Sequence, residues 1–328
     1  MSETPLVSIV IPSYNEERDI LACVEAALGI VYPNKEIIVA DSSDDRTPTL
    51  LHPLAEGGSI RLIHEDRRLS VSGARNRGIR AAKGDILVLL NADVVPSPDF
   101  LQRILPHYRN GADFVICESE VANQGKIVPD FLHAVHVTEL GREDDLVWSE
   151  GWSCRGAVFE RAGLFDERFP GASGEDEAFG RNLLRLGFRR VVDHSIPVRH
   201  ITPEDLRGLL HQMVGRGRGE YYFTVLFRRL NPAPAVRRIL GRWVILAGLI
   251  AALPLFPLGT ALGAAGILLV GIRALRSGLR LARSHGGLVR VLPFAGLNFL
   301  RFRALEYGFV FAHWRAPQHL DGWRQERQ

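Results

Sequence analysis

One acidic residue stands where a carboxylate can do chemistry. The segment from Gly84 to Asp93 (Gly-Asp-Ile-Leu-Val-Leu-Leu-Asn-Ala-Asp) contains a short apolar run that predicts a buried strand, with Asp93 just past its carboxyl end. In an open α/β sheet, ligands bind in the crevice beyond the carboxyl ends of the strands. An Asp in that crevice can hold a divalent cation, which in turn can hold a diphosphate. The alternative is that Asp93 caps the following helix, and this segment alone leaves both open.

The elements around this strand predict how it is positioned. Apolar runs alternate with stretches of helical spacing, a pattern typical of βαβ units and a mainly parallel sheet. The predicted strands are 6–11, 36–40, 60–64, 86–90, 114–117 and 189–193, and the predicted helices are 16–28, 72–82, 101–108, 177–186 and the helical region 203–230.

Composition limits the class of protein. The chain has 328 residues, of which 46% are hydrophobic, and a formal charge of +3, which is too small to indicate a nucleic-acid partner. Its three cysteines, Cys23, Cys117 and Cys154, lack metal-binding spacing, and no signal-peptide pattern precedes the first strand. We therefore expect reduced thiols in a cytoplasmic compartment.

The C-terminal third differs from the rest. Residues 243–272 are nearly free of charge and long enough to span a bilayer, but Pro254, Pro257 and Gly259 interrupt them and arginines flank both ends. Cations on both flanks favour a membrane hairpin or a re-entrant element within 241–328, ending in a basic tail. Residues 203–240 and the charged apolar stretch 288–311 are predicted to be interfacial. A buried hairpin of a soluble domain is the alternative.

Five segments in order identify a resemblance: Val7 to Glu17 (Val-Ser-Ile-Val-Ile-Pro-Ser-Tyr-Asn-Glu-Glu), Glu36 to Asp45, Gly73 to Gly78, Gly84 to Asp93, and Gly174 to Glu177. Over about residues 6–200 the chain resembles family 2 glycosyltransferases of the GT-A fold. The resemblance implies inverting transfer of a sugar from a nucleotide-sugar to an acceptor hydroxyl. It also implies a catalytic domain at 1–202, with a nucleotide-binding half at about 1–117 and an acceptor half at 118–202.

The resemblance assigns donor contacts to residues after the strands. Pro12, Tyr14 and Glu16 would meet the base or ribose, although Glu16 could equally be a first-turn helix carboxylate. Asp41 resembles the residue that reads the uracil or guanine of a UDP or GDP donor. At the predicted start of a helix, Arg75 and Asn76 would face phosphate; a surface charge is the alternative for Arg75.

The metal site follows from the same match. Asn91, Ala92 and Asp93 take the place of the family's Asp-x-Asp, so that Asp93 would bind Mg²⁺ or Mn²⁺ while Asn91 keeps an acceptor oxygen but loses a charge. His200 resembles a histidine that completes the metal shell in some relatives. A structural histidine is the alternative.

The resemblance also implies the catalytic base. Asp176 is predicted to take the proton of the acceptor hydroxyl, with Glu175 orienting the acceptor or the sugar, although helix capping alone would explain an acidic pair there. Trp152 and Arg155 are expected under the donor sugar, where Trp152 would stack on a pyranose; a core aromatic is the alternative for Trp152.

Together these features predict a transferase with a lipid-linked acceptor in cell-envelope or exopolysaccharide assembly, on the cytoplasmic face of a membrane such as the bacterial inner membrane. Two alternatives remain: a polyprenyl-phosphate glycosyltransferase with phosphate as acceptor, and a degenerate GT-A membrane partner without activity. A nucleotidyltransferase of the same fold is disfavoured, because Ser13 to Glu17 is neither glycine-rich nor basic.

Overall fold

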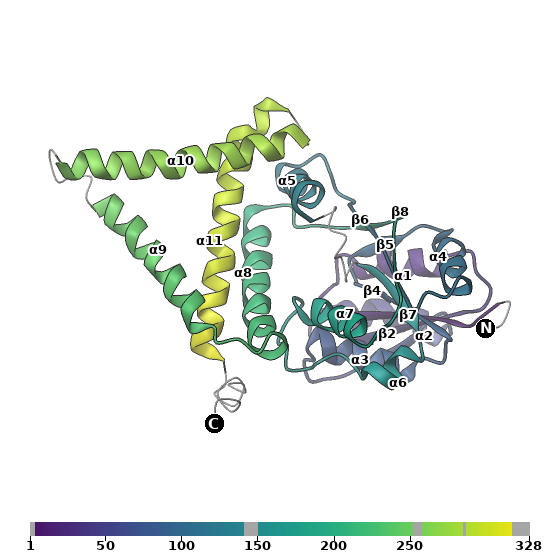
Figure 1. Ribbon diagram of the computed structural model, residues 1–328. Coiled ribbons are helices and arrows are strands. Elements are labelled where there is room, and N and C mark those ends of the chain that lie inside the picture. The colour runs from purple at the N-terminus through teal and green to yellow at the C-terminus, as the bar shows by residue number, and fades with distance from the viewer. Residues whose placement is uncertain (1–3, 141–149, 252–257, 285–286, 317–328) are drawn as a thin grey trace, which may run out of the picture. The chain divides into compact units, whose positions relative to one another are not determined.

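A computed structural model describes residues 4–140, 150–251, 258–284 and 287–316 of the chain (Figure 1). The chain forms two compact units. The first comprises residues 1–123 and 143–202, and the second comprises residues 124–142 and 203–328. The residues that the sequence singles out for chemistry all belong to the first unit.

The first unit is an α/β domain built on one eight-stranded sheet, ordered β3-β2-β1-β4-β7-β6-β8-β5. Strands β1 to β4 are parallel, and β6 is parallel to β8. Between these two groups β7 runs antiparallel to both neighbours, and β5 runs antiparallel to β8. The predicted α/β sheet is therefore present, but it is mixed. Its elements in chain order are β1 (Val7–Ser13), α1 (Ile20–Leu28), β2 (Lys35–Asp41), α2 (Thr47–Glu56), β3 (Arg61–His64), α3 (Val71–Ala81), β4 (Ile86–Leu90), β5 (Val94–Pro96), α4 (Phe100–Arg109), β6 (Phe114–Val121), β7 (Gly151–Arg155), α6 (Val158–Ala162), α7 (Glu175–Arg185) and β8 (Arg190–His200).

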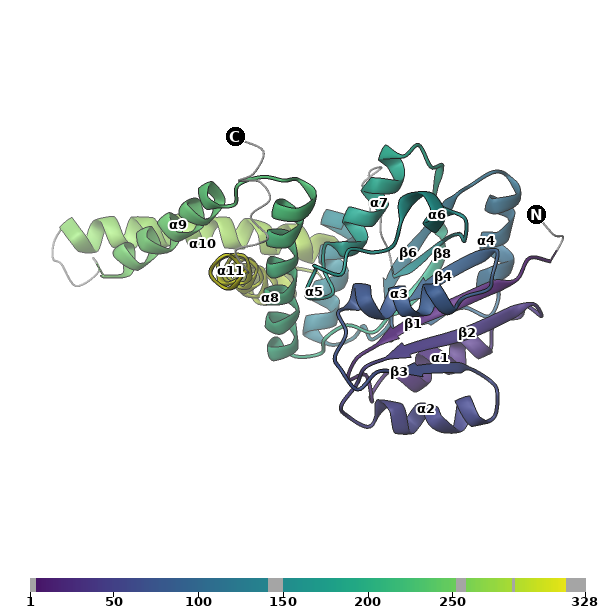
Figure 2. The same cartoon turned by 90° about the horizontal axis from the view of Figure 1, so that it is seen from below.

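Both faces of this sheet are covered, as the alternation of side chains along a strand requires. Ile86, Val88 and Leu90 of β4 belong to a core with α1, α2 and α4, whereas Leu87 and Leu89 belong to a second core with α3, α6 and α7. Figure 2 shows α1 and α2 on one side of the strands and α3 on the other. A rigid, doubly covered sheet thus holds the loops at the carboxyl ends of its strands.

The second unit is helical. Its elements are α5 (Ile127–Val135), the π-helix η1 (His136–Leu140), α8 (Leu206–Tyr222), the π-helix η2 (Phe223–Phe227), α9 (Ala233–Ala251), α10 (Leu258–Ser284), the short 3₁₀ helix η3 (Leu288–Arg290) and α11 (Val291–Arg315). Its core joins α5, α8, α10 and α11 around Phe131, Met213 and Phe294. Arg290 pairs with the buried Asp130, and Arg301 pairs with Glu139 at 2.8 Å.

The predicted apolar run 243–272 is divided between α9 and α10, and its middle, 252–257, with Pro254 and Pro257, lies outside the described residues. No helix in the described ranges combines enough length with enough apolar character to cross a bilayer. Helix α11 covers most of the stretch predicted to be interfacial, and several of its side chains, among them Phe294 and Val310, are buried.

Several elements were not predicted, among them α2 and β7, for physical reasons. Two prolines obscure the helical pattern of α2: Pro48 lies in the first turn, where proline is tolerated because the backbone N–H has no helical partner, whereas Pro53 lies inside the helix. The short β7 was missed because a five-residue strand that reverses the sheet direction has no helix-strand alternation to reveal it.

Helices α8 and α11 approach each other closely because glycines face the partner backbone. A Cβ added at Gly217 would lie 2.0 Å from the carbonyl oxygen of Leu305, and one at Gly308 would lie 2.1 Å from that of Val214. Gly215, two residues from Gly217 on the same helix, has open space around it. Residues 215–219 therefore form part of a helix and not a phosphate-binding loop.

We predict that Gly217→Ala lowers the free energy of unfolding by roughly 2–3 kcal/mol, because the added methyl group must push two backbones apart. Gly215→Ala is the matched control, and we expect it to be neutral or to stabilise by up to about 1 kcal/mol through helix propensity. Chemical denaturation followed by circular dichroism measures both. Equal effects of the two substitutions would contradict the close approach.

Candidate active site

Strand pairing brings Asp93 and His200 together across 107 positions of sequence. Val94 of β5 pairs with His200, the last residue of β8, and Ile201 donates its backbone N–H to the carbonyl oxygen of Asp93. As a result His200 Nε2 lies 3.1 Å from Asp93 Oδ2. The other carboxylate oxygen, Asp93 Oδ1, is buried and has no hydrogen-bond partner within the described residues. This unpartnered oxygen is a candidate metal ligand.

Glu150 completes a row of three side chains. It immediately precedes β7, whose first residue Gly151 pairs with Leu90 at the end of β4. This places Glu150 Oε1 3.4 Å from His200 Nδ1. The imidazole of His200 therefore lies between two carboxylates, one from each side of its ring. Glu150 was not predicted, because its position depends on the antiparallel strand that follows it.

Arg75 connects the first turn of α7 to the end of β4. Its Nη1 donates to Glu175 Oε1 at 2.7 Å and its Nη2 donates to the side-chain oxygen of Asn91 at 3.1 Å. Both Arg75 and Glu175 are buried. A buried, hydrogen-bonded ion pair of this kind fixes the distance between two elements, since neither charge can be left without its partner.

The acidic pair at the start of α7 has perturbed proton affinity. Burial, followed by the charge of Asp176, raises the pKa of Glu175 to about 7, and the guanidinium of Arg75 opposes this. Burial also raises the pKa of Asp176; Arg75 and the backbone N–H of Glu177 oppose that rise, and the charge of Glu150 adds to it. The influence of Glu150 on Asp176 indicates that α7 and the Asp93–His200–Glu150 row share one electrostatic environment.

Glu16 joins the same environment from the loop after β1. Burial, followed by the negative charge of Asp93, raises the pKa of Glu16 to about 8, and His200 acts in the opposite direction. The loop is held by hydrogen bonds from the backbone N–H of Asn15 to Ser43 Oγ (2.7 Å) and from that of Glu16 to Thr47 Oγ1 (3.0 Å). Asn15 adopts a φ of 57°, a left-handed conformation that Asn tolerates better than most residues.

Pro12 is buried at the end of β1, and the ring of Tyr14 lies in the loop beyond it with the guanidinium carbon of Arg68 4.3 Å from its centre. Arg68 was not predicted either. An aromatic ring with a cation on its face, at the carboxyl end of a central strand, provides a flat polar surface on which a base or ribose can lie.

Several comparisons with known proteins bear on this arrangement. Residues 8–149 match the model of glycosyl transferase family 2. The segment that matches, somewhat less than half of the chain, is a domain of that family. The putative glycosyltransferase EpsH of Bacillus subtilis is 31% identical over 128 residues, which make up 38% of this chain and 37% of that protein.

A dolichyl N-acetyl-alpha-D-glucosaminyl phosphate 3-beta-D-2,3-diacetamido-2,3-dideoxy-beta-D-glucuronosyltransferase of Methanococcus voltae is 25% identical over 251 residues, 67% of this chain and 76% of that enzyme. Among solved structures, the mannosyltransferase PcManGT from Pyrobaculum calidifontis, in complex with GDP-Man and Mn²⁺, aligns with a TM-score of 0.61 at 20% identity, covering 96% of this chain and 89% of that one. The likeness shows that the two share a fold. The chain thus carries a family 2 glycosyltransferase domain, and its fold is shared with that mannosyltransferase.

The residues of this site can hold a divalent cation only together with ligands from outside the protein. Within the described ranges, no group of three His, Cys, Asp or Glu side chains is placed to hold a metal ion. Asp93 and His200 offer two ligands, and the unpartnered Oδ1 of Asp93 suits a cation whose other ligands are phosphate oxygens and water. The donor set therefore fits Mg²⁺ or Mn²⁺ bound together with a nucleotide.

The structure corrects the prediction that Asn76 faces phosphate. Its side-chain amide donates to the carbonyl oxygen of Phe165 and to Glu167, both at 2.9 Å, and its oxygen accepts the N–H of Phe165. Asn76 therefore holds the segment that leads to α7. Arg75 needs a similar correction, because its two terminal nitrogens bond Glu175 and Asn91 and not an open phosphate site.

Trp152 and Arg155 were also wrongly placed under the sugar. Trp152 is buried against Phe114, Phe165 and Phe179, with ring centres 5.9–6.4 Å apart, so that it is a core aromatic. Arg155 pairs with Ile86 at the start of β4, and its guanidinium donates to the carbonyl oxygens of Ala112 and Tyr108. Arg155 therefore lies beside the start of β4, whereas Asp93 follows the end of that strand.

Asp41 lies at the end of β2 as predicted, but its carboxylate is completely buried. It accepts from Ser43 Oγ at 2.5 Å and lies 2.7 Å from His64 Nδ1, whose strand β3 runs parallel and in register. Both oxygens are engaged within the protein, so Asp41 stabilises the loop that carries Ser43, which in turn holds Asn15. A direct contact with a base would require those bonds to be exchanged.

We predict that Arg75→Met lowers the free energy of unfolding by about 3 kcal/mol or more, because Glu175 loses its buried cation. Arg77→Met on the same helix is the control: its partner Glu65 is partly exposed, and we expect a change below about 1 kcal/mol. Replacing both members of the buried pair (Arg75→Met with Glu175→Leu) should recover most of the loss. Denaturant titrations measure these three variants and Glu175→Leu alone, and additive losses from the two single substitutions would contradict the pairing.

The Arg75→Met loss should depend on pH. The pKa of Glu175, about 7 in the native state, lies above its ordinary value of 4.5. The native state therefore binds the extra proton, and the contribution of Glu175 to stability falls as pH rises from about 4.5 through 7. Without Arg75 this fall steepens, so that the variant should lose more stability at pH 8 than at pH 5. A loss that is equal at both pH values would show that Glu175 does not depend on Arg75.

Proposed function

We propose that this protein transfers a sugar, with inversion, from a nucleotide diphosphate sugar to a lipid-linked acceptor. The observation that supports the proposal most is the convergence of Asp93, His200, Glu150 and the Glu175–Asp176 pair, all at the carboxyl end of β4, from four separate parts of the chain. In an α/β sheet this edge is where nucleotides bind.

Asp93 and His200 would hold Mg²⁺ or Mn²⁺. The mannosyltransferase of the same fold is in complex with GDP-Man and Mn²⁺, which supports the use of such a cation. When bound, the cation stabilises the negative charge that develops on the departing diphosphate. The excess of carboxylates supports this role, because the pKa of Glu16 is raised partly by Asp93 and a cation at Asp93 would relieve that repulsion.

The donor nucleoside would lie on the loop after β1, where Tyr14 and the backbone near Pro12 face the carboxyl edge. Asp41 stabilises this loop through Ser43, whose hydroxyl group donates to Asp41 and accepts the backbone N–H of Asn15. Ala92 is buried between Asn91 and Asp93, and these two neighbours would contact the diphosphate. Uracil and guanine are the two bases to test, since neither is favoured by the residues present.

Asp176 would act as the general base. Its Oδ1 accepts the N–H of Glu177 at 2.8 Å, so Oδ2 is the atom that takes the proton from the acceptor hydroxyl as the hydroxyl attacks the anomeric carbon. Burial raises its pKa, which strengthens it as a base, while the charge of Arg75 opposes that rise. Glu175 would orient the acceptor only through its remaining oxygen, because the other bonds Arg75.

An acceptor hydroxyl is favoured over an acceptor phosphate. Arg75 is the guanidinium bonded within this cluster, and its terminal nitrogens already bond Glu175 and Asn91, so a phosphate acceptor would meet carboxylates. The relative from Methanococcus voltae is named for a dolichyl-phosphate-linked sugar acceptor, which supports a lipid-linked sugar here. We place the reaction at the cytoplasmic face of a membrane, in envelope or exopolysaccharide assembly.

The proposal predicts separate effects of two substitutions. Asp176→Asn should lower the rate of sugar transfer by about 100-fold or more while nucleotide binding persists, because only the proton acceptor is lost. Asp93→Asn should lower the rate and also weaken Mn²⁺-dependent nucleotide binding. Release of nucleoside diphosphate from a panel of UDP- and GDP-sugars, together with calorimetric binding, measures both effects.

Asp66→Asn is the control for these variants, because the Asp66 side chain is fully exposed. We expect it to behave as the unmodified protein. Full transfer activity in Asp93→Asn and Asp176→Asn would overturn the mechanism, and the absence of any transfer or hydrolysis by the unmodified chain with every donor would favour a partner without activity.

A further inference from the structure

The second unit carries an unusual distribution of charge. Residues 221–305 contain twelve arginines, no lysine and no aspartate or glutamate. Four of these arginines lie on α10, at positions 273, 276, 280 and 283. Spacings of three, four and three residues place them on one face of the helix. This row of cations therefore has no carboxylate on its own helix to pair with.

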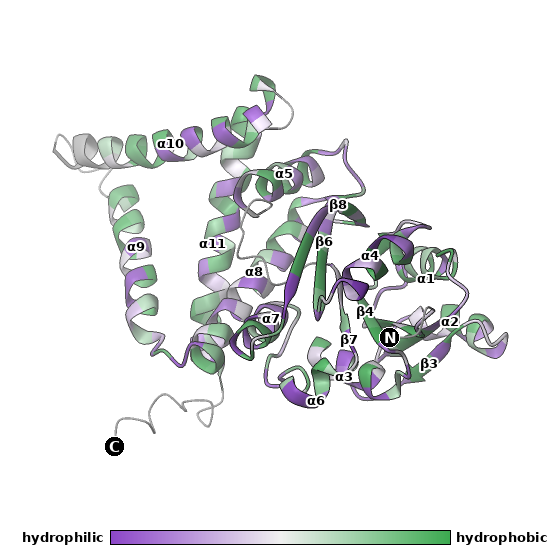
Figure 3. Ribbon diagram, turned by 45° about the vertical axis from the view of Figure 1, so that its right-hand side comes forward, coloured by the Kyte–Doolittle hydropathy of each residue, from purple (hydrophilic) through white to green (hydrophobic). Residues whose placement is uncertain are grey.

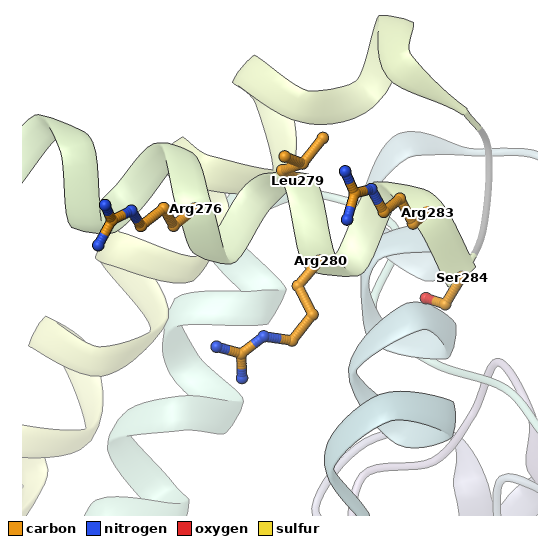
Figure 4. Close-up of a pocket in the computed structure, with 5 residues that line it drawn as sticks. All are labelled: Arg276, Leu279, Arg280, Arg283 and Ser284. Atoms are coloured by element: carbon orange, nitrogen blue, oxygen red, sulfur yellow. The ribbon is translucent and has the colours of Figure 1, made fainter.

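Three of these side chains line a hollow. Arg276, Arg280 and Arg283 surround an open depression of about 530 Å³, together with Leu279 and Ser284. Figure 4 shows that they project from successive turns near the C-terminal end of α10. The hollow belongs to the second unit alone and shares no residue with the candidate active site.

The arginines of the hollow lack the partners that other arginines of this unit have. Arg290 pairs with Asp130, Arg301 with Glu139, and Arg242 and Arg303 with Glu306. Within the described part of the chain, no carboxylate lies within 4.0 Å of Arg276, Arg280 or Arg283. Their charge is therefore available to an external anion.

Apolar side chains are exposed on both sides of this row. Leu268 and Leu269 on α10 are 64% and 62% exposed, and beyond its C-terminal end Val289 is 92% exposed, with Leu288 and Leu292 above 70%. Figure 3 shows hydrophobic and hydrophilic segments following each other along the α10 ribbon. An amphipathic helix with arginines among exposed aliphatic chains matches an interface where phosphate overlies hydrocarbon.

We propose that this face of α10 is an anionic-lipid site, in which Arg276, Arg280 and Arg283 bind phosphate headgroups while the neighbouring leucines and valine enter the acyl boundary. A guanidinium donates two parallel hydrogen bonds to a phosphate, which distinguishes headgroup binding from general attraction to a charged surface. The inference rests on the membrane location within the proposed function, but not on the transfer chemistry.

The test is flotation of the full chain with vesicles of phosphatidylcholine alone and of phosphatidylcholine with phosphatidylglycerol. We expect binding to the anionic vesicles to be much tighter, and Arg280→Gln with Arg283→Gln to weaken it by on the order of 20-fold. Arg237→Gln with Arg238→Gln is the matched control, since it removes two exposed arginines from α9 of the same unit and should weaken binding only a few-fold.

Equal binding to neutral and anionic vesicles would overturn the inference. So would equal weakening of binding by the two double variants, or no weakening by either. Displacement of the protein from vesicles by inorganic phosphate at constant ionic strength would also overturn it. Equal binding to both vesicle types would leave the proposed membrane location intact. Failure of binding to any vesicle would remove both the lipid site and the proposed membrane location. Nucleoside diphosphate release, measured on the same preparations, reports separately on the transfer chemistry. Unchanged circular dichroism verifies that each variant is folded.

Discussion

The buried ion pair between Arg75 and Glu175 is the interaction on which the rest of the site depends. It joins α3 to α7 across 100 positions of sequence, and through Asn91 it also reaches the end of β4. Burying two charges costs free energy that their attraction only partly returns, and a hydrophobic pair of similar volume would often be as stable. The pair is therefore better explained by position: it holds the α7 carboxylates beside the strand end that carries Asp93.

The same environment concentrates carboxyl groups. Glu16, Asp93, Glu150 and Asp176 come from separate parts of the chain, and the raised pKa values of Glu16 and Asp176 reflect both burial and repulsion between these groups. Such an arrangement is unfavourable by itself but suits a site that receives a divalent cation with a nucleotide. It also links the two halves of the proposed reaction, since a cation at Asp93 changes the field at the base on α7.

Much of this could be predicted from the sequence, and the remainder depends on strand pairing. Strand β4 has the predicted bounds, because five apolar residues between Gly-Asp and Asn-Ala-Asp have no other good solution. The edge position of Asp93 followed from it. Glu150 and the Arg68–Tyr14 contact could not be predicted, because each depends on where a loop lies relative to strands distant in sequence. His200 was proposed only by resemblance, and the β5–β8 pairing explains its position.

The wrong predictions for Asn76 and Trp152 have a common cause. Asn76 and Trp152 have side chains that can serve a ligand or a core, and periodicity cannot separate the two uses. Asn76 is buried because the segment before α7 needs its amide, and Trp152 is buried because β7 turns it toward Phe165 and Phe179. The predicted domain boundaries met a similar difficulty. Residues 124–142 belong to the helical unit, although in sequence they lie between two strands of the sheet.

The central claim is that Asp93 and His200 together hold the cation that accompanies the donor. Electron spin echo spectroscopy of Mn²⁺ bound with UDP or GDP tests it most directly, because a ligated imidazole gives a nitrogen modulation of its own. We expect that modulation in the unmodified protein and its loss in His200→Gln, in which Mn²⁺ still binds with the nucleotide. A bound Mn²⁺–nucleotide complex without nitrogen modulation, or with modulation that persists in His200→Gln, would contradict the account.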